Sequence, residues 1–148
     1  PGGTPVSVNV APPVDSVRGD GHILVVDDEN IIREFLSNML EDLGYRVTLC
    51  AGGKEAMKAY RKIWKTVDLV ILDMIMPDMD GKATFIELRK VNPRARIILS
   101  SGYSMETAAR DILVEGAVGV LQKPFHSAEL SRQLAHIMMA TAPAERKQ

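Results

Sequence analysis

In Gly21-His-Ile-Leu-Val-Val-Asp-Asp28, a short apolar run ends abruptly in two carboxylates. The same pattern returns at Asp68-Leu-Val-Ile-Leu-Asp73. Apolar runs of this length, without polar alternation, are typical of strands that are buried on both faces in the middle of a parallel sheet.

Shorter strand-like and helix-like segments alternate around these two runs. Further strands are predicted over 46–50, 96–99 and 118–122, and helices over 32–43, 54–64, 83–90, 107–115 and from 127 onward. Alternation at this spacing predicts parallel strands joined by right-handed crossovers, with helices on both faces of the sheet. The predicted fold class is therefore α/β, a doubly wound (βα)5 domain.

Composition and charge argue against several classes of function. The 148 residues suit one domain, and 46% apolar with 25% charged residues is ordinary for a soluble protein. The apolar runs are far too short to span a bilayer. A net charge of -1 argues against a nucleic-acid-binding surface. The single cysteine, Cys50, excludes an internal disulfide and fits a cytoplasmic location. Because the apolar runs are short and the net charge is near zero, we expect neither nucleic-acid nor membrane contact by this domain.

The two ends of the chain differ from the middle. Residues 1–20 contain Pro1, Pro5, Pro12 and Pro13 but no Leu, Ile or aromatic residue, which is typical of a linker. The alternating valines of 6–10 nevertheless follow a strand pattern, so we expect this linker to carry the end of a preceding domain. We expect one folded domain over 21–140 and a flexible tail over 141–148.

Polar side chains follow four of the predicted strands directly. Asp27 and Asp28 follow the first, Asp73 the third, Ser101 the fourth and Lys123 the fifth. Each alone has an ordinary explanation as a helix cap, a turn residue or a solvated lysine. Because the carboxyl ends of parallel strands meet at one edge of the sheet, we expect all of them in one crevice.

This combination of side chains predicts a site for a phosphoryl group and a divalent cation. Clustered carboxylates repel one another and need a cation to stay ionised. Oxygen ligands without a His or Cys partner favour Mg²⁺ or Mn²⁺ over zinc. A lysine supplies a point charge for a phosphate, and a serine supplies a hydroxyl donor.

The sequence resembles the receiver domain of two-component response regulators over about 21–139. The resemblance rests on Val-Val-Asp-Asp-Glu at 25–29, Leu-Asp-Met-Ile-Met-Pro-Asp-Met-Asp-Gly at 72–81, Ile-Leu-Ser-Ser-Gly at 98–102 and Gly-Val-Leu-Gln-Lys-Pro-Phe at 119–125. It implies a flavodoxin-like sheet in the strand order 2-1-3-4-5, with the site at the topological switch point.

The resemblance also implies a role for each acidic residue. Asp73 would be the phosphoacceptor, taking its phosphoryl group from a phosphohistidine on a histidine kinase or a histidine phosphotransfer domain. Asp27, Asp28 and Asp73 would hold Mg²⁺ (or Mn²⁺), together with the backbone carbonyl of Ile75. The domain would catalyse its own phosphorylation and dephosphorylation without being a turnover enzyme.

For the other two site residues, the resemblance implies contact with the phosphoryl group. Ser101 would donate a hydrogen bond to a phosphoryl oxygen. Lys123 would pair with Asp73 before transfer and with the phosphoryl group afterwards. The peptide bond between Lys123 and Pro124 is expected to be cis.

Three positions depart from the usual receiver pattern. Val120 stands where receivers often carry an aromatic residue, so the usual inward rotation of that ring is not expected. Ile75 and Tyr103 border the expected path of the hydrolytic water, and neither offers a carboxylate or carboxamide to orient it. We therefore expect slow self-dephosphorylation.

The opening Gly-Gly-Thr-Pro-Val-Ser-Val-Asn-Val-Ala-Pro of 2–12 is similar to the closing strand of histidine-kinase ATPase domains. The expected parent is therefore a hybrid histidine kinase, with any membrane anchor in the parent. The alternatives are a stand-alone regulator, a binding module that is not phosphorylated, and a Mg²⁺-dependent phosphatase. The phosphatase ranks last because such enzymes carry a second Asp two positions after the nucleophile, where this chain has Ile75. The resemblance places signalling, and any homodimer, on the face of the fourth helix, fifth strand and fifth helix.

Overall fold

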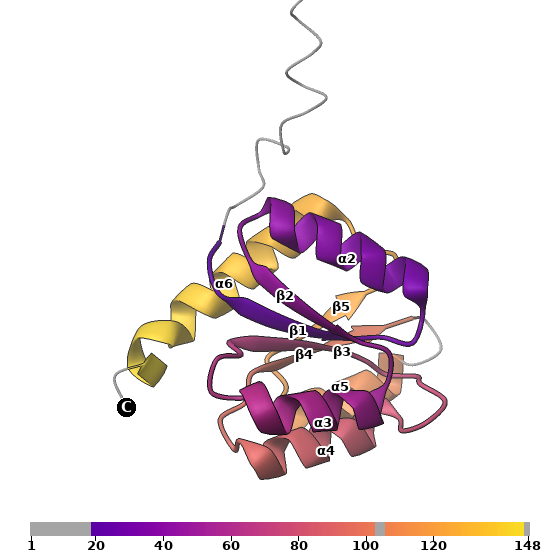
Figure 1. The fold of residues 1–148 in the computed structure, drawn as a ribbon. Coiled ribbons are helices and arrows are strands. Elements are labelled where there is room, and N and C mark those ends of the chain that lie inside the picture. Colours follow the sequence, from indigo (N-terminus) through magenta and orange to yellow (C-terminus); the bar gives the residue numbers. More distant parts are fainter. Residues whose placement is uncertain (1–18, 103–105, 147–148) are drawn as a thin grey trace, which may run out of the picture.

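One parallel sheet organises the protein. The computed structural model describes residues 19–102 and 106–146. Its strands are β1 (His22–Val26), β2 (Arg46–Cys50), β3 (Leu69–Asp73), β4 (Ile97–Ser101) and β5 (Gly119–Gln122). They pair in the order β2-β1-β3-β4-β5, all parallel, which confirms the predicted flavodoxin-like order (Figure 1).

Helices cover both faces of this sheet. α2 (Asn30–Asp42) and α6 (Ser127–Arg146) lie on one face, and α3 (Gly53–Ile63), α4 (Gly81–Val91) and α5 (Glu106–Val114) lie on the other (Figure 1). Apart from the end of α6, the predicted element ends are within one or two residues of those observed. None of the helices in the described ranges is long and apolar enough to cross a membrane.

The C-terminal helix is longer than the sequence indicated. α6 continues to Arg146, so residues 141–146 are helical where a flexible tail was predicted. Ala140, Ala142 and Ala144 favour a helix whereas Pro143 disfavours one, so intrinsic propensity does not explain the extension. The segments 1–18 and 103–105, with the predicted kinase-like strand and Tyr103, lie outside the described residues.

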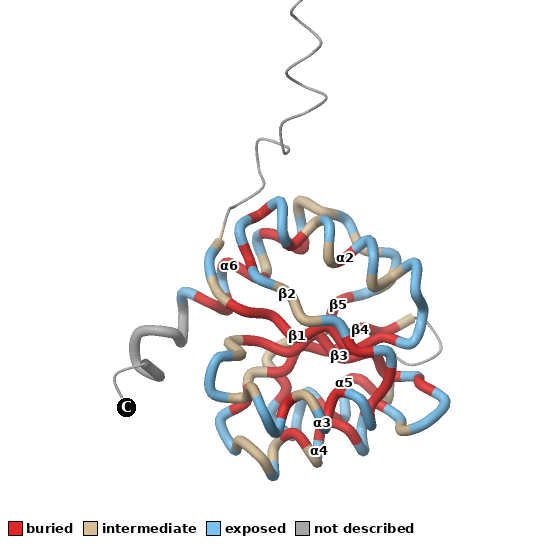
Figure 2. Tube along the Cα trace, viewed as in Figure 1, coloured by how far each residue is buried: buried red, intermediate tan, exposed pale blue. Residues whose placement is uncertain are grey.

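The core has two parts, one on each face of the sheet. All residues of β1, β3 and β4 are buried, whereas β2 is partly exposed as an edge strand (Figure 2). Leu36, Leu40 and Leu134 pack against one face. Tyr60 and Phe85 belong to the cluster on the other. Each buried side chain of this size contributes about 1.5–3 kcal/mol, which holds the strand ends in fixed positions.

Two aspartates fix the loop that follows β3. The carboxylate of Asp80 caps α4 by accepting the main-chain N–H of Ala83 at 2.8 Å. The carboxylate of Asp78 accepts the N–H groups of Gly53 at 3.3 Å and Lys54 at 3.1 Å. The loop is therefore attached to the first turn of both α3 and α4.

Candidate functional site

The carboxyl edge of the sheet gathers the predicted acidic residues and the lysine. Asp27 and Asp28 follow β1, Asp73 ends β3, and Lys123 follows β5. Carboxylate oxygens of the three aspartates lie within 4.8 Å of one another. Asp28 and Asp73 border an open pocket of about 320 Å³, which Ile75 and Gly102 also line.

The carboxylates differ in burial. Asp27 is 1% and Asp73 5% exposed, whereas Asp28 is exposed. Asp27 Oδ1 accepts the main-chain N–H of Glu29 at 2.9 Å, and the Asp27 carbonyl accepts a hydrogen bond from Arg33 Nη1 at 2.8 Å. Asp27 Oδ2 is buried without a well-formed hydrogen bond, although an ammonium lies nearby.

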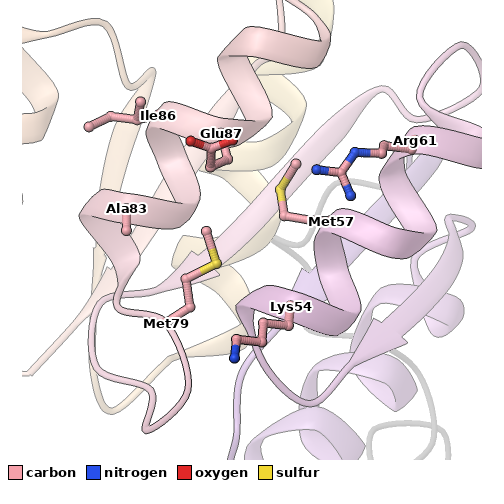
Figure 3. Close-up of a pocket in the computed structure, with 7 residues that line it drawn as sticks. All are labelled: Lys54, Met57, Arg61, Met79, Ala83, Ile86 and Glu87. Atoms are coloured by element: carbon pink, nitrogen blue, oxygen red, sulfur yellow. The ribbon is translucent and has the colours of Figure 1, made fainter.

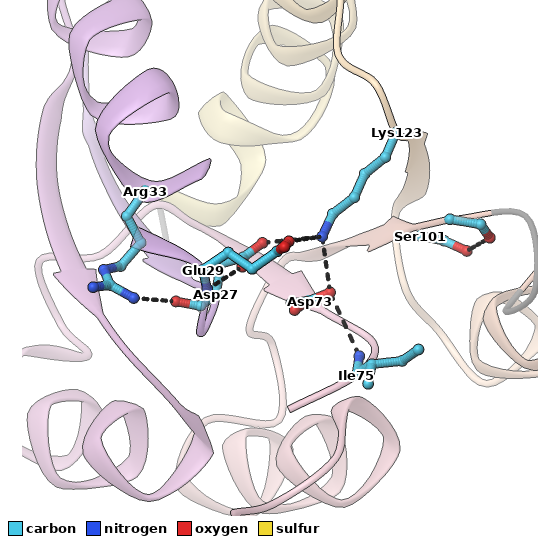
Figure 4. Close-up of polar contacts among 8 residues, drawn as sticks. Asp27, Glu29, Arg33, Asp73, Ile75, Ser101 and Lys123 are labelled. Carbon is cyan, nitrogen blue, oxygen red and sulfur yellow. Dashed lines mark hydrogen bonds and ion pairs between the residues drawn. The ribbon is translucent and has the colours of Figure 1, made fainter. Parts of the chain in front are cut away.

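That ammonium belongs to Lys123, which offsets part of the negative charge of the cluster. Its Nζ lies 3.3 Å from Asp27 Oδ2, 3.3 Å from Asp73 Oδ1 and 3.5 Å from Glu29 Oε1 (Figure 4). The main-chain N–H of Lys123 donates to the Ser101 carbonyl at 2.8 Å, which continues the pairing of β4 with β5. The Lys123–Pro124 bond is cis, as predicted.

Burial and mutual repulsion raise the pKa values of the inner carboxylates. Burial, followed by the charge of Asp27, raises the pKa of Asp73 to about 6, although Lys123 partly opposes this. Burial also raises the pKa of Asp27. Burial alone would lower the pKa of Lys123, but Asp73 and Asp27 outweigh it, so the pKa of Lys123 is raised.

These shifts predict how stability depends on pH without a metal. A carboxyl group with a raised pKa in the folded state contributes stability at low pH, and the contribution is lost as pH rises from the unfolded value of 3.8 to the folded value of about 6. For Asp73 the loss approaches about 3 kcal/mol. We expect urea unfolding in EDTA to show this decrease and 10 mM Mg²⁺ to reduce it. Equal slopes with and without Mg²⁺ would contradict this prediction.

Two further predicted residues follow from the ends of the neighbouring strands: Ser101 ends β4, and Ile75 comes two residues after the end of β3. The Ser101 hydroxyl donates to the Gly102 carbonyl at 3.0 Å, so it would have to rotate to reach a phosphoryl oxygen (Figure 4). The Ile75 main-chain N–H donates to Asp73 Oδ1 across a long 3.5 Å. The Ile75 side chain is 55% exposed at the pocket mouth.

Sequence reasoning missed two supporting residues. Glu29 shares the ammonium of Lys123, and Arg33 holds the carbonyl of Asp27. The sequence offered a weak signal for each, since Glu29 directly follows the acidic pair and Arg33 lies on the first turn of the next helix.

The donor set fits a small hard cation. Three carboxylates offer oxygen ligands at one point, and the buried Asp27 Oδ2 has only the ammonium of Lys123 beside it. Within the described ranges no histidine or cysteine joins this cluster, so its chemistry favours Mg²⁺ or Mn²⁺ over zinc.

Comparison with known families agrees with this geometry. Residues 23–135 match the family described as the response regulator receiver domain. The chain belongs to this family. As a receiver domain it is part of two-component signalling, the role implied by the resemblance in its sequence.

Curated relatives show the same domain in different proteins. The receiver domain is 33% identical over 122 residues to Sensor kinase CckA of Brucella abortus, covering 82% of this chain and 13% of the relative. It is 36% identical over 128 residues to the transcriptional regulatory protein ZraR of Escherichia coli O157:H7, covering 82% and 29% respectively. The chain thus spans less than a third of either relative.

Solved structures agree on the fold. A response regulator receiver domain protein from Clostridium thermocellum superposes with a TM-score of 0.80 at 27% identity, covering 84% of this chain and 98% of the other. A CheX-CheY-BeF3-Mg complex from Borrelia burgdorferi gives 0.75 at 27% identity, covering 80% and 89%. In that second structure, the complex named includes Mg²⁺.

Proposed function

We propose that Asp73 accepts a phosphoryl group from a phosphohistidine. The observation that carries the proposal is a buried carboxylate, 5% exposed, at the end of β3 and 3.3 Å from the ammonium of Lys123. An Asp73 oxygen attacks phosphorus, the P–O bond forms, and the P–N bond breaks as the donor imidazole leaves. Such a transfer needs positioning and charge neutralisation more than covalent assistance.

Asp27, Asp28 and Asp73, with the Ile75 carbonyl, would hold Mg²⁺, and Mn²⁺ could replace it. When bound, the cation supplies positive charge next to the phosphoryl oxygens. The carboxylate cluster and the buried Asp27 Oδ2, which has only the ammonium of Lys123 beside it, support this assignment.

Lys123 and Ser101 act on the transferred group. Lys123 neutralises Asp73 before transfer, and its flexible ammonium moves to a phosphoryl oxygen afterwards. The Ser101 hydroxyl exchanges the Gly102 carbonyl for another phosphoryl oxygen. Each residue therefore changes its partner during the reaction.

Exposed apolar side chains on α2 and at the pocket favour a protein as phosphoryl donor. Ile31 is 76%, Ile75 55% and Phe35 40% exposed, and the Phe35 ring stacks on Phe125 with centroids 6.3 Å apart. Apolar groups of this size on α2 and beside the pocket suit a partner's helix. The proposed partner is a histidine kinase or a histidine phosphotransfer domain.

The proposed parent is a hybrid histidine kinase. A sensor kinase is among the relatives, as are transcriptional regulators, so the proposal rests on the kinase-like sequence of 2–12. A cytoplasmic location and a homodimer through α5, β5 and α6 remain predictions.

The function is tested with acetyl phosphate, a small phosphoryl donor that needs no partner. We expect a single phosphate adduct by intact mass in Mg²⁺ and none in EDTA. Peptide mapping after borohydride reduction of the acyl phosphate should place it on Asp73. An absence of adduct at every Mg²⁺ concentration would favour a receiver-fold binding module that is not phosphorylated, and an adduct on another residue would contradict the assignment of Asp73.

The phosphorylated protein is expected to lose its phosphate slowly. Ile75 is exposed at the pocket mouth, and its side chain has no group to orient a water molecule. The change Ile75→Asn should accelerate decay severalfold because a carboxamide can hold the attacking water, while Ile75→Val should decay like the wild type. The measurement is adduct loss by intact mass after removal of acetyl phosphate, and wild-type decay within seconds would refute the prediction.

A further inference from the structure

A second cavity lies between α3 and α4, apart from the site of Asp73. Its volume is about 460 Å³, which is within the range of ligand-binding pockets. Its apolar floor is formed by Met57 of α3, Met79 of the loop before α4, and Ala83 and Ile86 of α4 (Figure 3). Methionine side chains adapt their shape to an occupant, so this floor suits apolar anchors.

One rim of the cavity is positively charged. Lys54 and Arg61 are exposed on α3 and border the cavity. On the α4 rim, the carboxylate of Glu87 lies 3.0 Å from Lys90 Nζ, in an exposed ion pair within its own helix. A negatively charged occupant would therefore meet Lys54 and Arg61, while Glu87 has a cation of its own beside it.

The two helices that border the cavity carry a net positive charge. α3 and α4 hold two acidic residues, Glu55 and Glu87, and many more basic ones: Lys54, Lys58, Arg61, Lys62, Lys82, Arg89 and Lys90. The whole chain carries a net charge of -1, so positive charge is concentrated on these two helices. Such a surface attracts acidic partners over distances of about a Debye length.

The loop that precedes α4 is attached to α3 beside the cavity. Asp78 binds the N–H groups of Gly53 and Lys54, which attaches the loop bearing Met79 to the start of α3. A groove that is already formed does not spend binding energy on ordering the loop.

We propose that the α3–α4 groove binds an acidic amphipathic helix of a partner protein. A space between two packed helices accepts a third helix by ridge-into-groove packing, with apolar anchors at i, i+3, i+4 and i+7. Acidic residues beside those anchors complement Lys54 and Arg61. The groove shares no lining residue with the pocket at Asp73, so this proposal is independent of the proposed function.

The probe is a helical peptide of about 18 residues, long enough to form a stable helix, with leucines at the anchor positions and glutamates beside them. A second peptide carries lysines in place of the glutamates. The protein is labelled with methyl-¹³C methionine, so that Met57 and Met79 report on the groove, while Met39 and Met138 report on the other face of the sheet. We expect the glutamate peptide to shift the Met57 and Met79 signals and the lysine peptide to shift neither.

Charge reversals separate a specific site from general attraction. Lys54→Glu with Arg61→Glu should weaken binding of the glutamate peptide about tenfold, because each exposed ion pair contributes about 0.2–1 kcal/mol. Lys58→Glu with Lys62→Glu changes the same helix by the same charge, but these residues border another cavity on α3, so the affinity should fall less than threefold. Circular dichroism and acetyl-phosphate labelling check that both variants fold.

Several results would overturn the proposal. One is equal weakening by the two double variants, which would indicate attraction to α3 as a whole. Others are equal binding of the lysine peptide, shifts confined to Met39 and Met138, or no shift at all.

Discussion

Replacing Asp73 with asparagine is expected to abolish phosphorylation and at the same time to stabilise the metal-free protein at pH 7. Asparagine has no nucleophilic carboxylate, so the Mg²⁺-dependent phosphate adduct should be absent. Asp73 is buried beside Asp27, and its pKa is raised to about 6, so its charge is unfavourable in the folded state. Removing that charge should raise the free energy of unfolding by about 1–3 kcal/mol.

The gain in stability from Asp73→Asn should increase as pH rises. At about pH 4 the carboxyl group of Asp73 is largely protonated in the folded protein, so the variant and the wild type should have similar stability. The difference should grow as pH rises to about 7. Urea unfolding in EDTA measures it, and the exposed Asp111→Asn serves as control, with an expected change below about 0.5 kcal/mol. A variant less stable than the wild type at pH 7 would contradict the argument.

Replacing Lys123 with methionine is expected to give the second large effect. Methionine keeps much of the side-chain volume but leaves Asp27 and Asp73 without their ammonium, which lies 3.3 Å from each. Buried charges that lose their partner destabilise strongly, so we expect a loss of about 2–4 kcal/mol at pH 7 without metal. Phosphorylation should slow about 100-fold because the developing phosphoryl charge loses a cation.

Mg²⁺ and low pH should each reverse most of this destabilisation. The metal supplies positive charge at the same carboxylates, and protonation of Asp73 removes the repulsion. The control is Lys90→Met, which breaks the exposed pair with Glu87 and should change stability by less than about 1 kcal/mol. Thermal melts with Mg²⁺ and with EDTA provide the comparison. If Lys123→Met melts like the wild type in EDTA at pH 7, Lys123 is not the counter-ion of the cluster.

The sequence predicted the fold and the location of the site because both depend on short-range patterns. Apolar runs that end in Asp27 and Asp73 identify buried parallel strands and place their carboxyl ends together. The site depends on which residues follow which strands, and that order is readable directly. Family resemblance supplied the roles, which remain proposals until the phosphorylation experiment is done.

Other features depend on tertiary contacts that a sequence pattern does not encode. The Ser101 hydroxyl turns to the Gly102 carbonyl, a rotamer choice made by neighbouring backbone. Glu29 reaches Lys123 across 94 positions of sequence. The attachment of Asp78 to α3 likewise joins segments 25 positions apart. Only the folded chain brings these groups within hydrogen-bonding distance.

Lys123 also affects how a metal ion binds to the acidic cluster. Without a divalent ion the acidic cluster already has a cation, so the domain folds around its own internal counter-ion. An incoming Mg²⁺ must compete with the ammonium of Lys123, which is covalently tethered to the chain and cannot diffuse away. The affinity for Mg²⁺ therefore depends on how much more favourably the carboxylates interact with the metal than with this ammonium. Such competition favours readily reversible occupancy, in which the ion is an exchangeable reagent and not a structural component of the fold.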